Sequence, residues 1–127
     1  GVLQLIYKPR RLLEKVVSRL ADDGVLAIGV SNYRSVGARM FGSHWRGLGV
    51  PRHISHFTPQ TLERLLRSVG LRIVYRHFET PKWITAGSVD DALPGPRKKP
   101  AKAGAYSMAK LVDGSSWSDT IEVYARR

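Results

Sequence analysis

Cysteine is absent from the 127 residues of this sequence. Its absence excludes disulfide bonds and metal sites built on thiolates, and it favours a cytoplasmic over a secreted protein. Long apolar runs are missing as well, so we expect no segment to cross a membrane. The N-terminus carries no basic segment followed by an apolar leader, and we therefore expect no targeting signal.

Acidic residues are scarce in the sequence. It has 10 aspartates and glutamates against 21 lysines and arginines, which gives a formal net charge of +11. Such an excess suits an anionic partner such as RNA. The basic residues are nevertheless scattered, and their one cluster, Arg97 to Lys102, lies in a stretch typical of a mobile linker. Nucleic acid is therefore not the favoured partner, and we expect a basic linker with one short helix over residues 81–118.

Residues 58–70 carry the clearest local signals in the chain. Thr58 can accept hydrogen bonds from the free N–H groups of a first helical turn, and Pro59 suits the first helical position because no donor is needed there. Gly70 can supply the left-handed residue that ends the helix. A strand is expected directly afterwards, from Leu71 to Phe78. The apolar stripe of the helix consists of Leu62, Leu65, Leu66 and Val69.

Three further elements fix the fold class. The spacing of apolar residues predicts an amphipathic helix over Pro9–Ala21. The run Val25–Val30 is apolar on both faces, which is typical of a central parallel strand covered by helices on each side. Residues Thr120–Ala125 alternate with period two and predict a last, antiparallel strand at a sheet margin. The fold class is therefore α/β.

A central parallel strand needs a neighbour on both of its edges. Only two or three other strands can be found, so one edge of Val25–Val30 would lie bare. A bare apolar edge promotes association and is normally covered. We therefore expect that upstream strands belong to a longer protein, which fits a sequence that starts without methionine, and that the isolated chain self-associates through this edge.

The long loop over residues 31–57 leaves the carboxyl end of the Val25–Val30 strand. Open α/β sheets bind ligands on that side, and loops of this length in compact domains are usually functional. Glycines, aromatic residues and histidines fill the loop, with one possible helical turn near Ser35 to Phe41. We interpret it as a lid over a substrate cleft.

Several residues of this loop are candidates for substrate binding. Asn32 could orient a polar group of the substrate or form an Asx turn. Trp45 could pack the loop onto the body or stack on a substrate. Arg52 could pair with an anionic group. The full set of candidates is Asn32, Tyr33, Trp45, Arg52, His53 and His56.

His53 and His56 have several possible roles. Each could act as a base, donate a hydrogen bond to substrate, or hold the loop together. Two histidines spaced i, i+3 without a clear third ligand are a weak zinc signal, and we expect no metal.

The loop Pro51–Pro59 reads PRHISHFTP and leads into a helix that ends at Val69-Gly70-Leu71. With other short matches, this block resembles the C-terminal half of class I S-adenosylmethionine-dependent methyltransferases over residues 1 to about 80. The strand near residues 120–125 fits the terminal antiparallel strand of that family. The resemblance implies a partial Rossmann-like sheet with flanking helices. The other matching pieces are Val2-Leu3-Gln4, Pro9-Arg10-Arg11-Leu12-Leu13, Asp23-Gly24-Val25-Leu26 and Ser31-Asn32.

The sequence departs from the family pattern at three places. The family has an acidic residue and a histidine where this chain has Gln4-Leu5, an aspartate at Lys8, and a proline at Ser31. The family pair lies beside the cofactor pocket, so the resemblance places Val2, Leu3 and Gln4 next to S-adenosylmethionine. The glycine-rich loop and the acidic residue that hold the cofactor in the family have no counterpart here.

The resemblance thus implies methyl transfer from S-adenosylmethionine to a small-molecule acceptor, largely by positioning and exclusion of water. We expect this chain to be a fragment that carries the acceptor-side lid and is inactive alone. The alternative is a non-catalytic α/β accessory module that binds an anionic partner such as RNA through its basic surface.

Overall fold

The computed structural model describes all residues from Gly1 to Arg127 and contains five α-helices and three strands. In chain order the elements are α1 (Pro9–Arg19), β1 (Leu26–Ser31), α2 (Val36–Phe41), α3 (Pro59–Ser68), β2 (Arg72–Glu79), α4 (Lys82–Ala92), α5 (Lys98–Val112) and β3 (Thr120–Arg126). Short 3₁₀ turns cover Val2–Leu5, Gly42–His44, Arg46–Leu48 and Gly95–Arg97. None of the helices has the length and apolar character needed to cross a bilayer.

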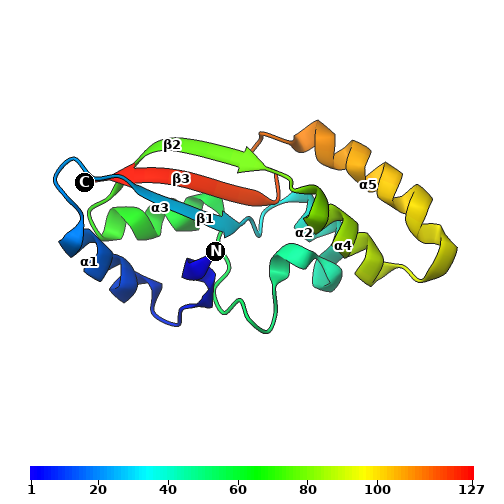
Figure 1. Cartoon of the computed structure of the whole chain (residues 1–127), viewed down its shortest axis with the longest axis horizontal. Coiled ribbons are helices and arrows are strands. Elements are labelled where there is room, and N and C mark those ends of the chain that lie inside the picture. Colours follow the sequence, from blue (N-terminus) through cyan, green and yellow to red (C-terminus); the bar gives the residue numbers. More distant parts are fainter.

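The three strands form one sheet in the order β1-β3-β2 (Figure 1). Strand β3 pairs antiparallel with both neighbours, with Ile28 opposite Val123 on one side and Phe78 opposite Ile121 on the other. The prediction of an antiparallel last strand is confirmed, but its expected place at the sheet margin is wrong. Period-two alternation reports which face of a strand is buried and carries no information about its place in the sheet.

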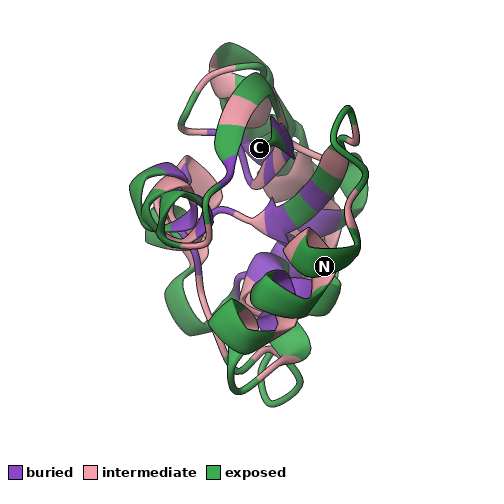
Figure 2. Cartoon of the chain, turned by 90° about the vertical axis from the view of Figure 1, so that its left-hand side faces the viewer, coloured by how far each residue is buried: buried purple, intermediate pink, exposed green.

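Strand β1 is an edge strand in this structure. The prediction of a central parallel strand covered on both faces is therefore wrong for this chain, since β1 pairs only with β3. Ile28 and Val30 are buried, whereas Ala27 and Gly29, which alternate with them, are exposed. Figure 2 shows the buried residues gathered toward the interior of the molecule and the exposed ones on its outer surface. Ala27 and Gly29 count as apolar in the sequence, but they are small, so the exposed face of β1 presents little apolar surface to water. The outer edge of β1 has no partner strand.

Helices α1 and α3 cover one face of the sheet (Figure 1). The ends of α3 are those that its sequence predicts. The Thr58 hydroxyl accepts from the N–H of Thr61 as part of a capping box. Gly70 has a φ of +83°, and the next N–H, that of Leu71, donates to the carbonyl of Leu66 at 3.0 Å. Leu62 and Leu66 have no exposed surface and lie at the centre of the core.

The segment between β2 and β3 folds differently from the expected linker. It forms two packed helices, α4 and α5, beyond the carboxyl ends of β1 and β2 (Figure 1). Pro100 is tolerated because it lies in the first turn of α5, where its missing N–H costs nothing. Alanines that resemble linker composition are strong helix formers, and Ala105 is buried.

Truncation at the core centre should measure how much of the stability α3 supplies. We expect Leu62→Ala to lower the free energy of unfolding by about 2–5 kcal/mol, because it leaves a cavity among buried side chains. Leu111→Ala is the matched control, since Leu111 is 81% exposed on α5. Urea denaturation followed by tryptophan fluorescence would test both. Equal effects of the two variants would contradict the core described here.

Candidate functional site

A cavity of about 240 Å³ opens at the carboxyl end of β1. Five segments far apart in the sequence line it: the N-terminus, the end of β1, the loop after Pro51, the start of α4, and the start of β3. Its position is the one that α/β sheets use for ligands. The polar or aromatic residues that line it are Gln4, Ser31, His53, Trp83, Thr120 and Glu122.

Gln4 is the most informative residue of this cavity. Its side chain is 1% exposed, and its Oε1 accepts from the N–H of Ser31 at 3.1 Å. Its backbone carbonyl accepts from the N–H groups of Ile54 and Ser55, which joins the N-terminus to the loop. The Nε2 group is buried without any hydrogen-bond partner. An unpaired buried donor costs about 1–3 kcal/mol, so a ligand oxygen at this point would recover that free energy.

His53 lies in the same cavity, against the backbone of Gly49. A Cβ atom at Gly49 would lie 2.2 Å from the His53 Nδ1, and this glycine also has a φ of +64°, so only glycine fits there. The Nδ1 atom is buried without a partner. Burial lowers the pKa of the His53 imidazole below its usual range. The ring is therefore neutral at neutral pH and can accept a proton or a hydrogen bond.

Asn32 has a structural role that the sequence left open. Its side chain is fully buried, and Nδ2 donates to the carbonyls of Ser116 at 2.9 Å and Ser118 at 2.8 Å. Its Oδ1 accepts from the N–H of Arg34 at 3.0 Å, which is the Asx turn. These bonds occupy the amide, so the structure favours the turn over an orienting contact with substrate.

Four other sequence candidates lie outside the cavity. The Tyr33 and His56 rings pack together with centroids 5.5 Å apart, and the His56 Nε2 donates to the carbonyl of Leu48 at 2.9 Å. Arg52 is exposed. Trp45 and Tyr33 line a separate hollow of about 550 Å³ within the loop. No group of three metal-ligating side chains lies close together.

Of the three residues predicted to contact the cofactor, Val2, Leu3 and Gln4, only one lines the cavity. Leu3 belongs to the core and Val2 is 68% exposed, so only Gln4 faces the cavity. Trp83 and Glu122 line the cavity but were not among the sequence candidates. Both lie on elements whose position the sequence did not predict, and a tryptophan soon after Pro81 was the only available signal for Trp83.

The loop over the cavity is fixed at two points. The Trp45 indole N–H donates to the Oδ1 of Asp119 at 3.1 Å, and Trp45 is 2% exposed, so it packs the loop onto the body. Arg46 pairs with Asp91 of α4 through two nitrogens, and its backbone N–H donates to the Ser88 hydroxyl at 2.9 Å. The loop is thus held against α4 and the turn before β3.

Comparison with protein families shows which family this domain belongs to. The sequence model of the methyltransferase domain matches residues 1–76, which is more than half of the chain. The chain belongs to the methyltransferase domain family. Among curated proteins, none matches the chain. The methyltransferase match includes Gln4, Ser31 and His53 but ends before Trp83 and Glu122, so the cavity combines family-matched residues with residues outside the match.

Asp119, which anchors the loop of this methyltransferase domain, should make stability depend on pH. Burial raises the pKa of its carboxyl, so the folded state favours the protonated form. A raised folded-state pKa contributes stability that is full at low pH and is lost as pH rises through that pKa. We expect Asp119→Asn to remove this loss, so that the stability of the variant relative to the parent improves as pH rises above about 4, the ordinary pKa of an aspartate. Denaturation at several pH values would measure it.

Gln60→Leu is the control for this experiment, because Gln60 is exposed on α3 and carries no titrating group. Its stability relative to the parent should stay constant over the same pH range. A similar pH trend in both variants would show that Asp119 is not the group responsible.

Proposed function

We propose that this chain forms the acceptor side of an S-adenosylmethionine-dependent methyltransferase, with the cavity of Gln4 and His53 as the place where the acceptor is held. The observation that carries the proposal is the buried, unpartnered Gln4 amide at the carboxyl end of β1. It lies in the family-matched part of the chain. A donor kept without a partner inside such a cavity is best explained by a ligand atom that accepts from it.

The side chains of the cavity suit the positioning of an acceptor. Gln4 would donate to an acceptor oxygen, and the neutral His53 would take a proton from the acceptor or hold it through a hydrogen bond. Trp83 is 67% exposed at the rim and would cover the acceptor and exclude water. The bound cofactor would supply an electrophilic methyl group. The contribution of this chain is orientation, which is a large part of catalysis between two bound groups.

The residues of this chain do not fit the whole cofactor. The cavity of about 240 Å³ is smaller than the sites of about 300–1,000 Å³ that hold drug-sized ligands. The sequence has no glycine-rich loop after a strand, and only Gln4 of the three predicted cofactor residues faces the cavity. We therefore propose that the main cofactor contacts lie elsewhere in the complete protein.

The unpaired outer edge of β1 supports the proposal that other parts of the complete protein bind the cofactor. An apolar hollow of about 320 Å³ runs beside it, lined by residues that include Leu12, Val16 and Ala27. An exposed strand edge next to apolar side chains is normally paired in a stable protein. We propose that further strands pair here and carry the cofactor-binding loop.

A basic accessory module remains the second candidate function, and the structure weakens its main support. Within the basic cluster, Lys102 pairs with Asp90 at 2.8 Å and Lys98 lies 3.9 Å from the same carboxylate. The cluster is thus part of a packed helix and is partly neutralised. Binding of RNA that falls steeply with salt and is lost on charge reversal at residues 97–102 would favour this second function.

Substitution of the cavity residues tests the proposed function. We expect Gln4→Leu to lower kcat/KM for methyl transfer by about tenfold, or about 1.4 kcal/mol, because the acceptor loses a buried donor. Gln60→Leu, on the exposed surface of α3, is the matched control and should have no effect. Release of S-adenosylhomocysteine by the complete protein would be measured. Equal rates for both variants would contradict the role of Gln4.

Calorimetry tests whether the cofactor contacts lie mainly outside this chain. We expect the isolated chain to bind S-adenosylmethionine no tighter than about millimolar, since most of the cofactor contacts lie outside it. Micromolar binding by these 127 residues would show that they hold the cofactor without a completing partner.

A further inference from the structure

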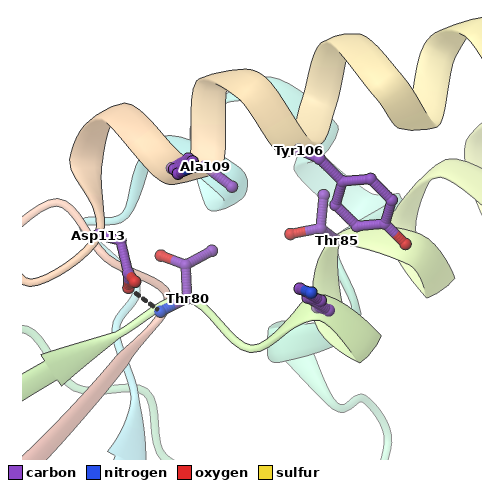
Figure 3. A pocket seen from close by; sticks show the side chains of 7 residues that line it. Thr80, Thr85, Tyr106, Ala109 and Asp113 are labelled. Carbon is purple, nitrogen blue, oxygen red and sulfur yellow. Dashed lines mark hydrogen bonds between the residues drawn. The ribbon is translucent and has the colours of Figure 1, made fainter.

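A second cavity, of about 320 Å³, lies between α4 and α5 (Figure 3). Its polar lining consists of Thr80, Lys82, Thr85, Tyr106, Lys110 and Asp113. It shares no lining residue with the cavity of Gln4 and His53. The first turn of α4 separates the two, because Lys82 and Thr85 line one cavity while Trp83 and Ile84 line the other.

The charges of this second cavity are positive on balance. Lys82 and Lys110 both line it, and neither takes part in a salt bridge. The single carboxylate is that of Asp113, whose Oδ1 accepts from the N–H of Thr80 at 2.7 Å. Two lysines without a salt bridge outweigh one carboxylate that already accepts a hydrogen bond, so the cavity favours an anionic ligand.

Thr85 gives an independent indication of a ligand. The residue is 3% exposed, and in Figure 3 its hydroxyl is directed into the cavity without a hydrogen bond to the residues around it. The hydroxyl forms no hydrogen bond within the chain and opens onto the cavity, so it is available to pair with a ligand oxygen there. Helix α4 starts at Lys82, and the N–H groups of Ile84 and Thr85 both donate to the carbonyl of Pro81, so only the N–H groups of Lys82 and Trp83 have no backbone acceptor.

The cavity also has an apolar part. In Figure 3 the ring of Tyr106 lies beside Thr85, and Ala109 follows one turn later on α5. An aromatic ring and a methyl group can pack against the carbon skeleton of a ligand, which a bare inorganic anion lacks.

We propose that the cavity between α4 and α5 binds a small organic anion, namely a carboxylate attached to an aromatic or aliphatic group. The carboxylate accepts from the Thr85 hydroxyl and from the first turn of α4, and Lys82 and Lys110 supply the opposite charge. The carbon skeleton packs against Tyr106. This site is distinct from the methyl-transfer cavity, and its occupancy does not depend on S-adenosylmethionine.

A titration of the ¹⁵N-labelled chain with benzoate, benzamide and inorganic phosphate tests the proposal. We expect benzoate to shift the amide signals of Thr80, Lys82, Thr85 and Tyr106 in a saturable way. Benzamide, which is nearly isosteric but neutral, should bind at least about tenfold more weakly because the lysines no longer contribute. Phosphate should also bind more weakly than benzoate, because it has no carbon skeleton to pack against the ring.

Three variants sharpen this titration. Lys82→Met should weaken benzoate binding by at least about fivefold, whereas Lys99→Met, which removes an exposed lysine outside the cavity, should leave it unchanged. Asp113→Asn should tighten binding, since it removes a like charge while the amide oxygen can still accept from Thr80. The proposal is overturned if benzoate shifts none of these signals, if benzamide or phosphate binds as well as benzoate, if the two lysine variants behave alike, or if Asp113→Asn weakens binding.

Discussion

The fold depends on the tether that Asn32 makes between the end of β1 and the turn before β3. Its side-chain amide holds the carbonyls of Ser116 and Ser118, and its backbone N–H donates to the carbonyl of Asp119 at 2.7 Å. These bonds bring together residues more than eighty positions apart and place β3 between β1 and β2. Because β3 contributes Glu122 and Asp119 fixes the loop through Trp45, the same tether assembles the cavity.

Local chemistry made part of this structure predictable. The helix after Thr58 begins and ends where its cap residues require, and the turn at Ser35 is a true helical start whose hydroxyl accepts from the N–H of Ala38. Each of these features is decided by residues within one or two turns of each other. For the same reason, the loop that begins at Pro51 could be recognised, and His53 from it faces the cavity.

Non-local pairing explains what the sequence did not reveal. The sequence of residues 120–126 does not indicate that this strand lies between two others, because its place in the sheet is determined by pairing with β1 and β2. The sequence predicts a linker at the start of α5 because lysines, a proline and a glycine there are typical of linkers, whereas in the structure Ala105 is buried and the segment packs as a helix. Trp83 and Glu122 depend on both elements, so their place in the cavity could not be predicted before the sheet order was known.

The most direct test of the account is a crystal structure, with S-adenosylhomocysteine, of the longer protein to which we propose that this chain belongs. The sulfur atom of that molecule marks where the methyl group leaves the cofactor. The account predicts that this sulfur faces the cavity of Gln4 and His53, with the rest of the molecule held by strands added at the free edge of β1. A sulfur directed away from that cavity, or a free edge of β1 in the complete protein, would contradict it.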